Sequence, residues 1–317
     1  MIIPIGHQSV LERFQRALGK GKLPHAWLLH GLTGIGKSVL AEAMAATYLC
    51  RRNMDPVHVE TACGECHACR MLAAGSHPDY FKTGLLEKKR DVRIEQVRDM
   101  LAFLQLSGAE SSRRVAILDD AELLNKHASN ALLKGLEEPA PGSLILLLSS
   151  NPSRLPPTVR SRSLLQAIAP LSREDCLKVL RGMEIGEPVL PLAADLACGC
   201  PGRVACMHNE DICSALEQFR ELTADPAELD IGKMELWLGR NSKRVPHDLI
   251  VEVILQYIYS ALYNKYDFSS KIAIDDAMSE LLEWPELVRR HSLRPAQSFL
   301  ARMLRLRLVL RDARQAA

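Results

Sequence analysis

Hydrophobic and polar positions follow two different rhythms in the first half of the chain. Some apolar residues form short continuous runs, which have the length of buried strands. These runs are 26–29, 115–118 and 144–148. Elsewhere apolar residues recur every three or four positions, as in helices that bury one face. The predicted helices are 8–19, 37–49, 92–104 and 128–138. Because strands and helices alternate, we expect an α/β fold with a parallel sheet.

The pattern changes after about residue 165, where no further buried strand is evident. Residues 172–207 indicate a small helical unit, and residues 211–313 contain mainly amphipathic helices. Residues 249–262 are apolar nearly all round, which is typical of a helix central to a bundle. Residues 303–310 alternate apolar residues with arginine and also fit a strand, but their Ala, Gln and Arg neighbours favour a helix.

The composition is that of an ordinary globular protein. The chain has 317 residues, of which 47% are hydrophobic and 25% charged, and its length suggests two or three domains. No apolar run reaches the ~18 residues that a membrane span needs. The first residues lack the basic and apolar segments of a secretory signal. We therefore expect a cytoplasmic protein that does not enter a membrane.

The net charge gives no support for tight, direct binding to DNA. It is only +2, from 40 Lys and Arg against 38 Asp and Glu. Affinity for phosphate backbones comes from an excess of basic side chains. A role with nucleic acid therefore requires a local basic patch or partner proteins.

Residues 31–38 carry the strongest chemical motif, G-L-T-G-I-G-K-S, which matches the P-loop pattern at every fixed position. In such loops backbone N–H groups surround a phosphate, the lysine reaches the β- and γ-phosphates, and the serine binds Mg²⁺. A predicted strand before the loop and a helix after it support this interpretation. The candidate nucleotide-binding residues here are Gly31, Thr33, Gly34, Gly36, Lys37 and Ser38.

Two acidic residues end the predicted strand 115–118. An acid at this place in a P-loop protein holds Mg²⁺, which makes Asp119 a candidate. Asp120 lies where a water-activating carboxylate is expected, so we take it as a weak catalytic candidate. An ordinary solvent-exposed pair of strand-end acids is the alternative, and only the neighbouring P-loop favours function.

The chain has nine cysteines, four of them in one short segment. Cys50, Cys63, Cys66 and Cys69 are spaced C-x12-C-x2-C-x2-C, which suits a closed, structural zinc site. His67 lies within this segment and is able to replace one cysteine. The remaining cysteines show no paired spacing, and we interpret them as ordinary thiols. They are Cys176, Cys198, Cys200, Cys206 and Cys213.

A basic segment at 156–163 follows the last predicted strand. Arg160 and Arg162 each carry a guanidinium that can bind two phosphate oxygens. The spacing alone favours a solvated surface pair.

These features together resemble the delta-prime family of bacterial DNA polymerase III clamp-loader subunits, which are AAA-plus relatives. The resemblance covers roughly residues 1–210, whereas the last hundred residues match only in length and helical character. It is carried by residues 23–31 leading into the P-loop, the four-cysteine insert, His77-Pro-Asp79, residues 130–139, Arg160-Ser161-Arg162 and residues 199–203.

The resemblance implies three domains and a set of partners. Residues 1–165 would form the AAA-plus module, with a zinc insert at 50–70, residues 166–208 a helical lid, and residues 209–317 a helical collar. The partners would be the gamma/tau motor subunits and the delta subunit in a hetero-pentamer. The sliding clamp and primed DNA would be met through that complex.

The resemblance also implies residue roles. Members of the family act as a stator, and an arginine in a Ser-Arg-Cys motif serves as a finger in the ATP site of a neighbouring subunit. Here the motif reads Ser161-Arg162-Ser163, so the finger role falls on Arg162. Arg203 stands where the lid arginine of the superfamily contacts the γ-phosphate. A finger stabilises the charge that develops on the transferring phosphoryl group.

Two departures from the family shape the functional prediction. Many members have a degraded P-loop, whereas this loop is intact. Motor subunits typically carry Asp-Glu where this chain has Asp119-Asp120, so Asp120 is one methylene shorter than their glutamate. We expect the site to bind ATP with Mg²⁺ and to hydrolyse it weakly. The chain would then be a component of the DNA-directed DNA polymerase III holoenzyme and itself at most a weak ATPase.

Two other functions remain open at this point. An ATP-hydrolysing motor subunit of the gamma/tau type is favoured by the intact loop 31–38, while Asp120 and the 77–79 segment favour the stator. A small-molecule kinase is disfavoured, because neither the helical second half nor the cysteine insert offers an acceptor pocket.

Overall fold

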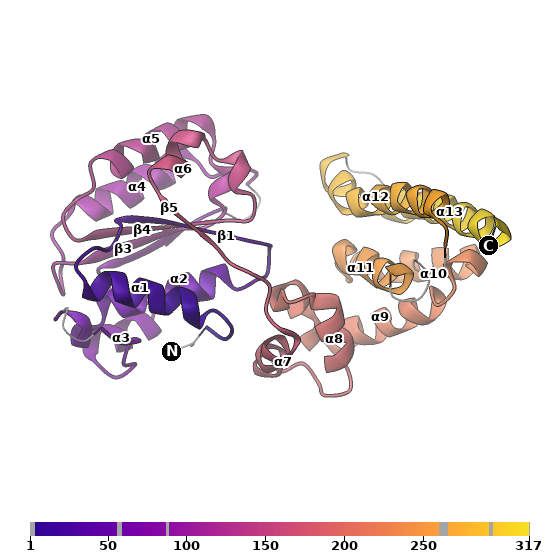
Figure 1. Cartoon of the computed structure of the whole chain (residues 1–317), viewed down its shortest axis with the longest axis horizontal. Coiled ribbons are helices and arrows are strands. Elements are labelled where there is room, and N and C mark those ends of the chain that lie inside the picture. The colour runs from indigo at the N-terminus through magenta and orange to yellow at the C-terminus, as the bar shows by residue number, and fades with distance from the viewer. Residues whose placement is uncertain (1–3, 56–58, 87–88, 260–265, 292–293, 317) are drawn as a thin grey trace. The chain divides into compact units, whose positions relative to one another are not determined.

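The computed structural model describes residues 4–55, 59–86, 89–259, 266–291 and 294–316. The chain divides into two compact units (Figure 1). The first unit combines residues 1–178 with 199–202, and the second combines 179–198 with 203–317. The chain thus returns to the first unit for four residues before it enters the second unit again.

A five-stranded parallel sheet lies at the centre of the first unit, with the strand order β2-β3-β4-β1-β5. The strands are β1 (Ala26–His30), β2 (Tyr80–Thr83), β3 (Arg114–Leu118), β4 (Ser143–Ser149) and β5 (Leu164–Ala167). Every residue of β3 and β4 is buried, as expected for strands covered on both faces. Because all strands run in one direction, the loops after β1, β3 and β4 meet at one edge of the sheet.

Helices cover both faces of this sheet (Figure 1). On one face lie α1 (Gln8–Gly19) and α2 (Lys37–Leu49), and α3 (His67–Ala73) packs against α2. The other face carries α4 (Ile94–Gln105) and α5 (Lys126–Glu137), and α6 (Pro157–Ser161) precedes β5.

Alternate residues of each strand pack into the two hydrophobic cores, one on each face of the sheet. Trp27 and Leu29 of β1 pack with α1 and α2, whereas Ala26 and Leu28 pack with α4 and α5. This is the two-residue period of a strand. The ring of Phe14 on α1 meets Trp27 edge-on, with 5.6 Å between the ring centroids. Helix α2 is rich in alanine and leucine, the residues with the highest helix propensity.

The predicted parallel α/β sheet is confirmed, and the three predicted strands are β1, β3 and β4. The four predicted helices are α1, α2, α4 and α5. Two strands were not predicted. Both β2 and β5 lie at sheet edges and are only partly buried, so they lack the continuous apolar run of a central strand.

The regular structure of the second unit is helical throughout its described residues. Its helices are α8 (Leu190–Ala197), α9 (Glu210–Leu222), α10 (Ile231–Asn241), α11 (His247–Tyr257), α12 (Phe268–His291) and α13 (Pro295–Ala316). Helix α7 (Arg173–Gly182) crosses the division between the units. The helical prediction for 303–310 is confirmed within α13. The helix predicted over 249–262 is confirmed by α11, and residues 260–262 lie outside the described residues.

Aromatic side chains fill the core of the second unit. Phe219 and Trp237 have ring centroids 4.5 Å apart, and those of Trp284 and Phe299 are 4.6 Å apart. The buried Trp284 satisfies its indole N–H by donating to Ser298 Oγ at 2.9 Å. Among the described residues, no helix combines the length and hydropathy that a membrane crossing requires.

Candidate functional site

The predicted phosphate loop connects the carboxyl end of β1 to the first residue of α2. Gly36 has φ +99°, a left-handed conformation that glycine adopts without strain. At Gly31 a β-carbon would lie 2.6 Å from the carbonyl oxygen of Ile168, so only glycine fits. Thr33 is exposed at the tip of the loop. The loop therefore has the glycine-dependent backbone of a P-loop, and the positive end of α2 faces it.

Lys37 folds back over this loop. Its ammonium donates to the carbonyl oxygens of Gly31 at 2.8 Å and Leu32 at 3.0 Å. Burial lowers the pKa of Lys37, and the negative charges of Glu122, Asp119 and Asp120 oppose that fall. The structure therefore brings the lysine and the strand-end acids of β3 into one electrostatic site.

Two residues that the sequence did not predict support the loop from outside. His7 is buried, and its Nε2 donates to the carbonyl oxygen of Ile35 at 2.9 Å. The backbone N–H of Gly202 donates to the carbonyl oxygen of Gly34 at 2.8 Å. Both contacts join segments distant in sequence. Gly202 lies in the 199–203 segment that carries the resemblance, but nothing in that segment indicated a contact with the phosphate loop.

Three carboxyl groups lie close together at the carboxyl end of β3, namely those of Asp119, Asp120 and Glu122. Asp119 Oδ1 accepts a hydrogen bond from the backbone N–H of Asp120 at 2.9 Å. Asp120 has φ +51°, which is uncommon for a residue with a side chain. Burial raises the pKa of Asp120, and the neighbouring charges of Asp119 and Glu122 raise it further. The carboxyl group at the predicted catalytic position thus holds its proton more tightly than a free aspartate does.

Glu122 is a third carboxylate at this site, and the sequence analysis missed it. It lies in the short 3-10 helix after β3, and its Oε1 accepts hydrogen bonds from the backbone N–H (2.9 Å) and the hydroxyl of Ser150, which follows β4. Burial alone would raise the pKa of Glu122, but several hydrogen bonds, first that from the Ser150 side chain, together lower it. Glu122 is therefore a carboxylate that favours its charged form, and its charge acts on Lys37.

The predicted magnesium ligand Ser38 already has a cation beside it. Lys82, on β2, donates from Nζ to Ser38 Oγ at 2.8 Å and to Glu42 Oε1 at 2.5 Å. Ser38 Oγ in turn donates to Glu42 Oε1 at 3.4 Å. A Mg²⁺ ion at Ser38 Oγ would be repelled by the Lys82 ammonium and would have to displace it from Ser38 and Glu42. The arrangement around Ser38 therefore does not fit Mg²⁺.

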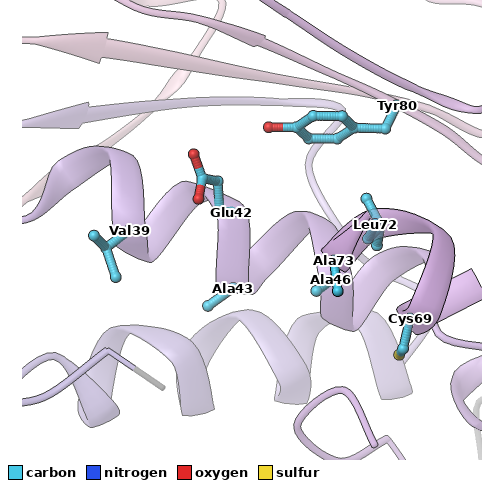
Figure 2. A pocket seen from close by; sticks show the side chains of 8 residues that line it. All are labelled: Val39, Glu42, Ala43, Ala46, Cys69, Leu72, Ala73 and Tyr80. Atoms are coloured by element: carbon cyan, nitrogen blue, oxygen red, sulfur yellow. The ribbon is translucent and has the colours of Figure 1, made fainter. Parts of the chain in front are cut away.

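A pocket of about 400 Å³ adjoins this cluster between α2, α3 and β2. Figure 2 shows Glu42 rising from α2 toward the strands and the Tyr80 hydroxyl pointing toward it. Burial raises the pKa of Tyr80 to about 12, and Glu42 contributes to that rise. The rest of the pocket is lined by small and apolar side chains together with one cysteine, namely Val39, Ala43, Ala46, Cys69, Leu72 and Ala73.

The four predicted metal-ligating cysteines come together. Their sulfur atoms all lie within 4.8 Å of one another, and Cys50 Sγ is 3.7 Å from Cys63 Sγ and 4.0 Å from Cys66 Sγ. Sulfurs at the corners of a zinc tetrahedron, with Zn–S of about 2.3 Å, are about 3.8 Å apart. The donor set and its spacing therefore fit a tetrahedral metal ion.

The thiols of the cluster differ in how readily they ionise. Backbone N–H groups, first that of Glu65, lower the pKa of Cys63 to about 6. Burial raises the pKa of Cys50 and of Cys69. A metal ion would compensate the negative charge that all four thiolates bring together. His67, the alternative ligand, instead faces Glu110, with 4.0 Å between Nε2 and Oε1. Among the described residues, the four cysteines form the cluster.

Arg162 lies at the end of α6, immediately before β5. Its guanidinium forms an ion pair with Glu137 Oε1 at 2.7 Å and donates to the carbonyl oxygen of Thr158 at 3.2 Å. Its side chain is 38% exposed, so the guanidinium remains accessible to another molecule. The amino end of β5 pairs with the amino end of β1, whereas the phosphate loop follows the carboxyl end of β1.

Arg203 belongs to the second unit and is paired within it. Its guanidinium donates to Glu252 Oε2 on α11 at 2.8 Å, and both side chains are mostly buried. It directly follows Gly202, the residue that contacts Gly34. The predicted contact between Arg203 and a γ-phosphate stays a prediction.

The strand order, the loop after β1 and the acids after β3 together define a P-loop α/β protein. Known structures support this class. A DNA polymerase III, gamma subunit-related protein from Thermotoga maritima aligns over 94% of this chain and 98% of its own, with TM-score 0.50 and 15% identity, and so shows the same fold.

The family model described as "DNA polymerase III, delta subunit" matches residues 6–172, more than half of the chain. The chain therefore belongs to this family. Residues 6–172 contain the sheet, the phosphate loop, the cysteine cluster and Arg162.

Two relatives named "DNA polymerase III subunit delta'" show the same relationship. The one from Pseudomonas aeruginosa is 47% identical over 149 residues, which cover 47% of this chain and 44% of the relative. The one from Escherichia coli is 30% identical over 214 residues, which cover 67% of this chain and 63% of the relative. The aligned part is thus less than two thirds of either relative.

Proposed function

We propose that this protein is the delta-prime subunit of the DNA polymerase III clamp loader, acting in DNA replication as a stator that donates an arginine finger. The family match and the relatives named delta' support the identity of the subunit. The position of Arg162, between α6 and the amino end of β5, supports the finger role.

The position of Arg162 relative to the phosphate loop of its own chain is the main observation in support of the proposal. Leu164 at the start of β5 pairs with Trp27, and the strands then run in parallel to His30, where the phosphate loop begins. Four paired positions advance a strand by roughly 10 Å. Arg162 therefore lies at the opposite edge of the sheet from its own loop, held and exposed. A phosphate that meets Arg162 belongs to another chain's nucleotide.

The partners follow from this role. The finger would enter the ATP site of a gamma/tau motor subunit, and the delta subunit would complete a cytoplasmic hetero-pentamer that meets the sliding clamp and primed DNA. Residues 1–165 would be the AAA-plus module, 166–208 the lid and 209–317 the collar that holds the subunits together. The helical second unit is consistent with a collar.

The subunit's own site would bind nucleotide rather than drive the complex. The intact loop and Lys37 supply the phosphate contacts. Asp120 is one methylene shorter than a glutamate, so its carboxylate reaches less far toward an attacking water molecule. The four cysteines would hold a structural zinc ion, because a closed set of four thiolates leaves no position for water or substrate.

A motor subunit of the gamma/tau type is the second candidate, and the intact phosphate loop favours it. Such a subunit would hydrolyse ATP at its own site with a finger from a neighbour. The charged Glu122, held by Ser150 near Lys37, is the group that would have to replace Asp120 as base.

The two candidates separate in a reconstituted complex with gamma/tau and delta subunits. Arg162→Ala should leave this chain's fold, zinc content and nucleotide affinity unchanged, but should lower the DNA- and clamp-stimulated ATPase of the complex. A finger is worth ~10³-fold or more at a single site, and the remaining motor sites would make the overall loss partial.

Arg181→Ala is the matched control, since Arg181 is also exposed and ion-paired, to Glu187. It should leave the ATPase of the complex unchanged. Full ATPase and clamp-loading rates with Arg162→Ala, in a complex whose assembly is verified, would disprove the finger. A loss caused by Lys37→Ala in this chain and none by Arg162→Ala would favour the motor.

A further inference from the structure

We propose that Lys82 supplies from within the chain the positive charge that Mg²⁺ supplies at the serine of other P-loops, so that nucleotide binding here is independent of divalent metal. This inference rests on the proposed nucleotide-binding role of residues 31–38. It concerns a residue on an edge strand, outside every motif of the sequence.

The ammonium of Lys82 is fixed at the start of α2 by two contacts. Its Nζ lies 2.8 Å from Ser38 Oγ and 2.5 Å from Glu42 Oε1. Ser38 and Glu42 are one helical turn apart on α2, so both present their oxygens to the same side. The lysine thus spans from β2 to the first two turns of the helix whose amino end faces the phosphate loop.

The strand geometry makes this contact a consequence of the fold. Tyr80 and Lys82 are two residues apart on β2 and therefore point to the same face of the sheet. Tyr80 packs in the core shared with α2 and faces Glu42 across the pocket of Figure 2. The parallel pairing of β2 with β3 holds Lys82 beside the carboxyl edge of the sheet, where the phosphate loop also lies.

Charge excludes a divalent ion from the same place. Mg²⁺ bound to Ser38 Oγ at about 2.1 Å would lie on the order of 5 Å from the Lys82 ammonium, and the two cations would repel each other. A phosphate, in contrast, gains from the ammonium directly. Lys82 is 37% exposed, so it can transfer its ion pair from Glu42 to an incoming phosphate without leaving the strand.

The test is the Mg²⁺ dependence of equilibrium nucleotide binding by the full chain. A fluorescent ADP analogue is titrated with Mg²⁺ and, separately, with a chelator. For the unaltered chain the two dissociation constants should agree within about twofold. Lys82→Met should weaken binding in chelator by about tenfold, the worth of one charge-assisted hydrogen bond, and Mg²⁺ should restore part of the loss.

Three further variants make the outcome specific. Lys82→Gln should behave like Lys82→Met, while Glu42→Gln keeps the ammonium and should remain independent of Mg²⁺. Lys233→Met is the control, because Lys233 is an exposed, ion-paired lysine of the second unit. Thermal unfolding verifies that each variant is folded.

Each remaining result overturns the inference. Binding by the unaltered chain that requires Mg²⁺, or Mg²⁺-independent binding that Lys82→Met leaves unchanged, rules out the role of Lys82 while the nucleotide site stands. No binding with or without Mg²⁺ rules out the nucleotide site itself, and the inference with it.

Discussion

The backbone N–H of Gly202 donates a 2.8 Å hydrogen bond to the carbonyl oxygen of Gly34 in the phosphate loop. The two backbone segments lie so close together that a β-carbon on Gly202 would be 2.8 Å from Gly34 Cα. Gly202 is the last residue of the short return to the first unit, and Arg203 follows it into the second. The backbone of the phosphate loop is thus joined directly to the point where the chain leaves for the second unit.

We expect Gly202→Ala to weaken nucleotide binding by about fivefold, because it removes one hydrogen bond of ~1 kcal/mol from the loop. It should also lower the melting temperature, since overpacking costs about 1–3 kcal/mol. Nucleotide titration and thermal unfolding measure both. Gly182→Ala is the control, since a β-carbon there meets nothing within 4 Å. Equal behaviour of the two variants would show that the contact is not required.

The cysteine cluster should hold one zinc ion per chain, because its sulfur spacing fits a closed tetrahedron. Cys66→Ser should abolish zinc binding and make residues 50–70 sensitive to protease, with little effect on nucleotide affinity. Elemental analysis and limited proteolysis measure this. Cys198→Ser alters an exposed thiol outside the cluster and should keep the metal. Metal-free protein with four titratable thiols at these positions would refute the zinc site.

The isolated chain should bind nucleotide measurably but hydrolyse it more slowly than about 1 per second, the lower end of ordinary enzymatic rates. The reason is the short side chain of Asp120 and the absence of a finger from a neighbour. Lys37→Ala should weaken binding by about tenfold, since a charge-assisted hydrogen bond to phosphate is lost. Fast turnover by the monomer, or unchanged binding by Lys37→Ala, would contradict this account.

Asp120→Asn should stabilise the protein most at neutral pH. Burial and the charges of Asp119 and Glu122 raise the pKa of Asp120 above its unfolded value. Its ionisation therefore destabilises the fold above the folded pKa, and this cost vanishes below the unfolded pKa. The difference in melting temperature between variant and unaltered chain should shrink as the pH falls through that range. A pH-independent difference would indicate instead that asparagine simply suits the backbone at φ +51°.

The hydrophobic pattern predicted the central strands because both faces of these strands are buried. Strands β3 and β4 are covered on both faces and read as continuous apolar runs. The edge strands β2 and β5 escaped prediction because each is four residues long and only partly buried. Their residues mix apolar and polar types without a clear period, so only pairing with β3 and β1 makes them strands.

The sequence by itself determined the parts of the site whose residues are neighbours in the chain. The loop 31–38, the acids at 119–120 and the spacing of the four cysteines each satisfy local backbone and ligand geometry, which a short motif encodes. The tertiary structure alone brought Lys82 to Ser38 across 44 residues and Glu122 to Ser150 across 28. It also set Arg162 at the edge of the sheet opposite its own phosphate loop. These relationships depend on the order and direction of the strands, which are decided by burial and hydrogen bonding between distant segments and leave no periodic trace in the chain.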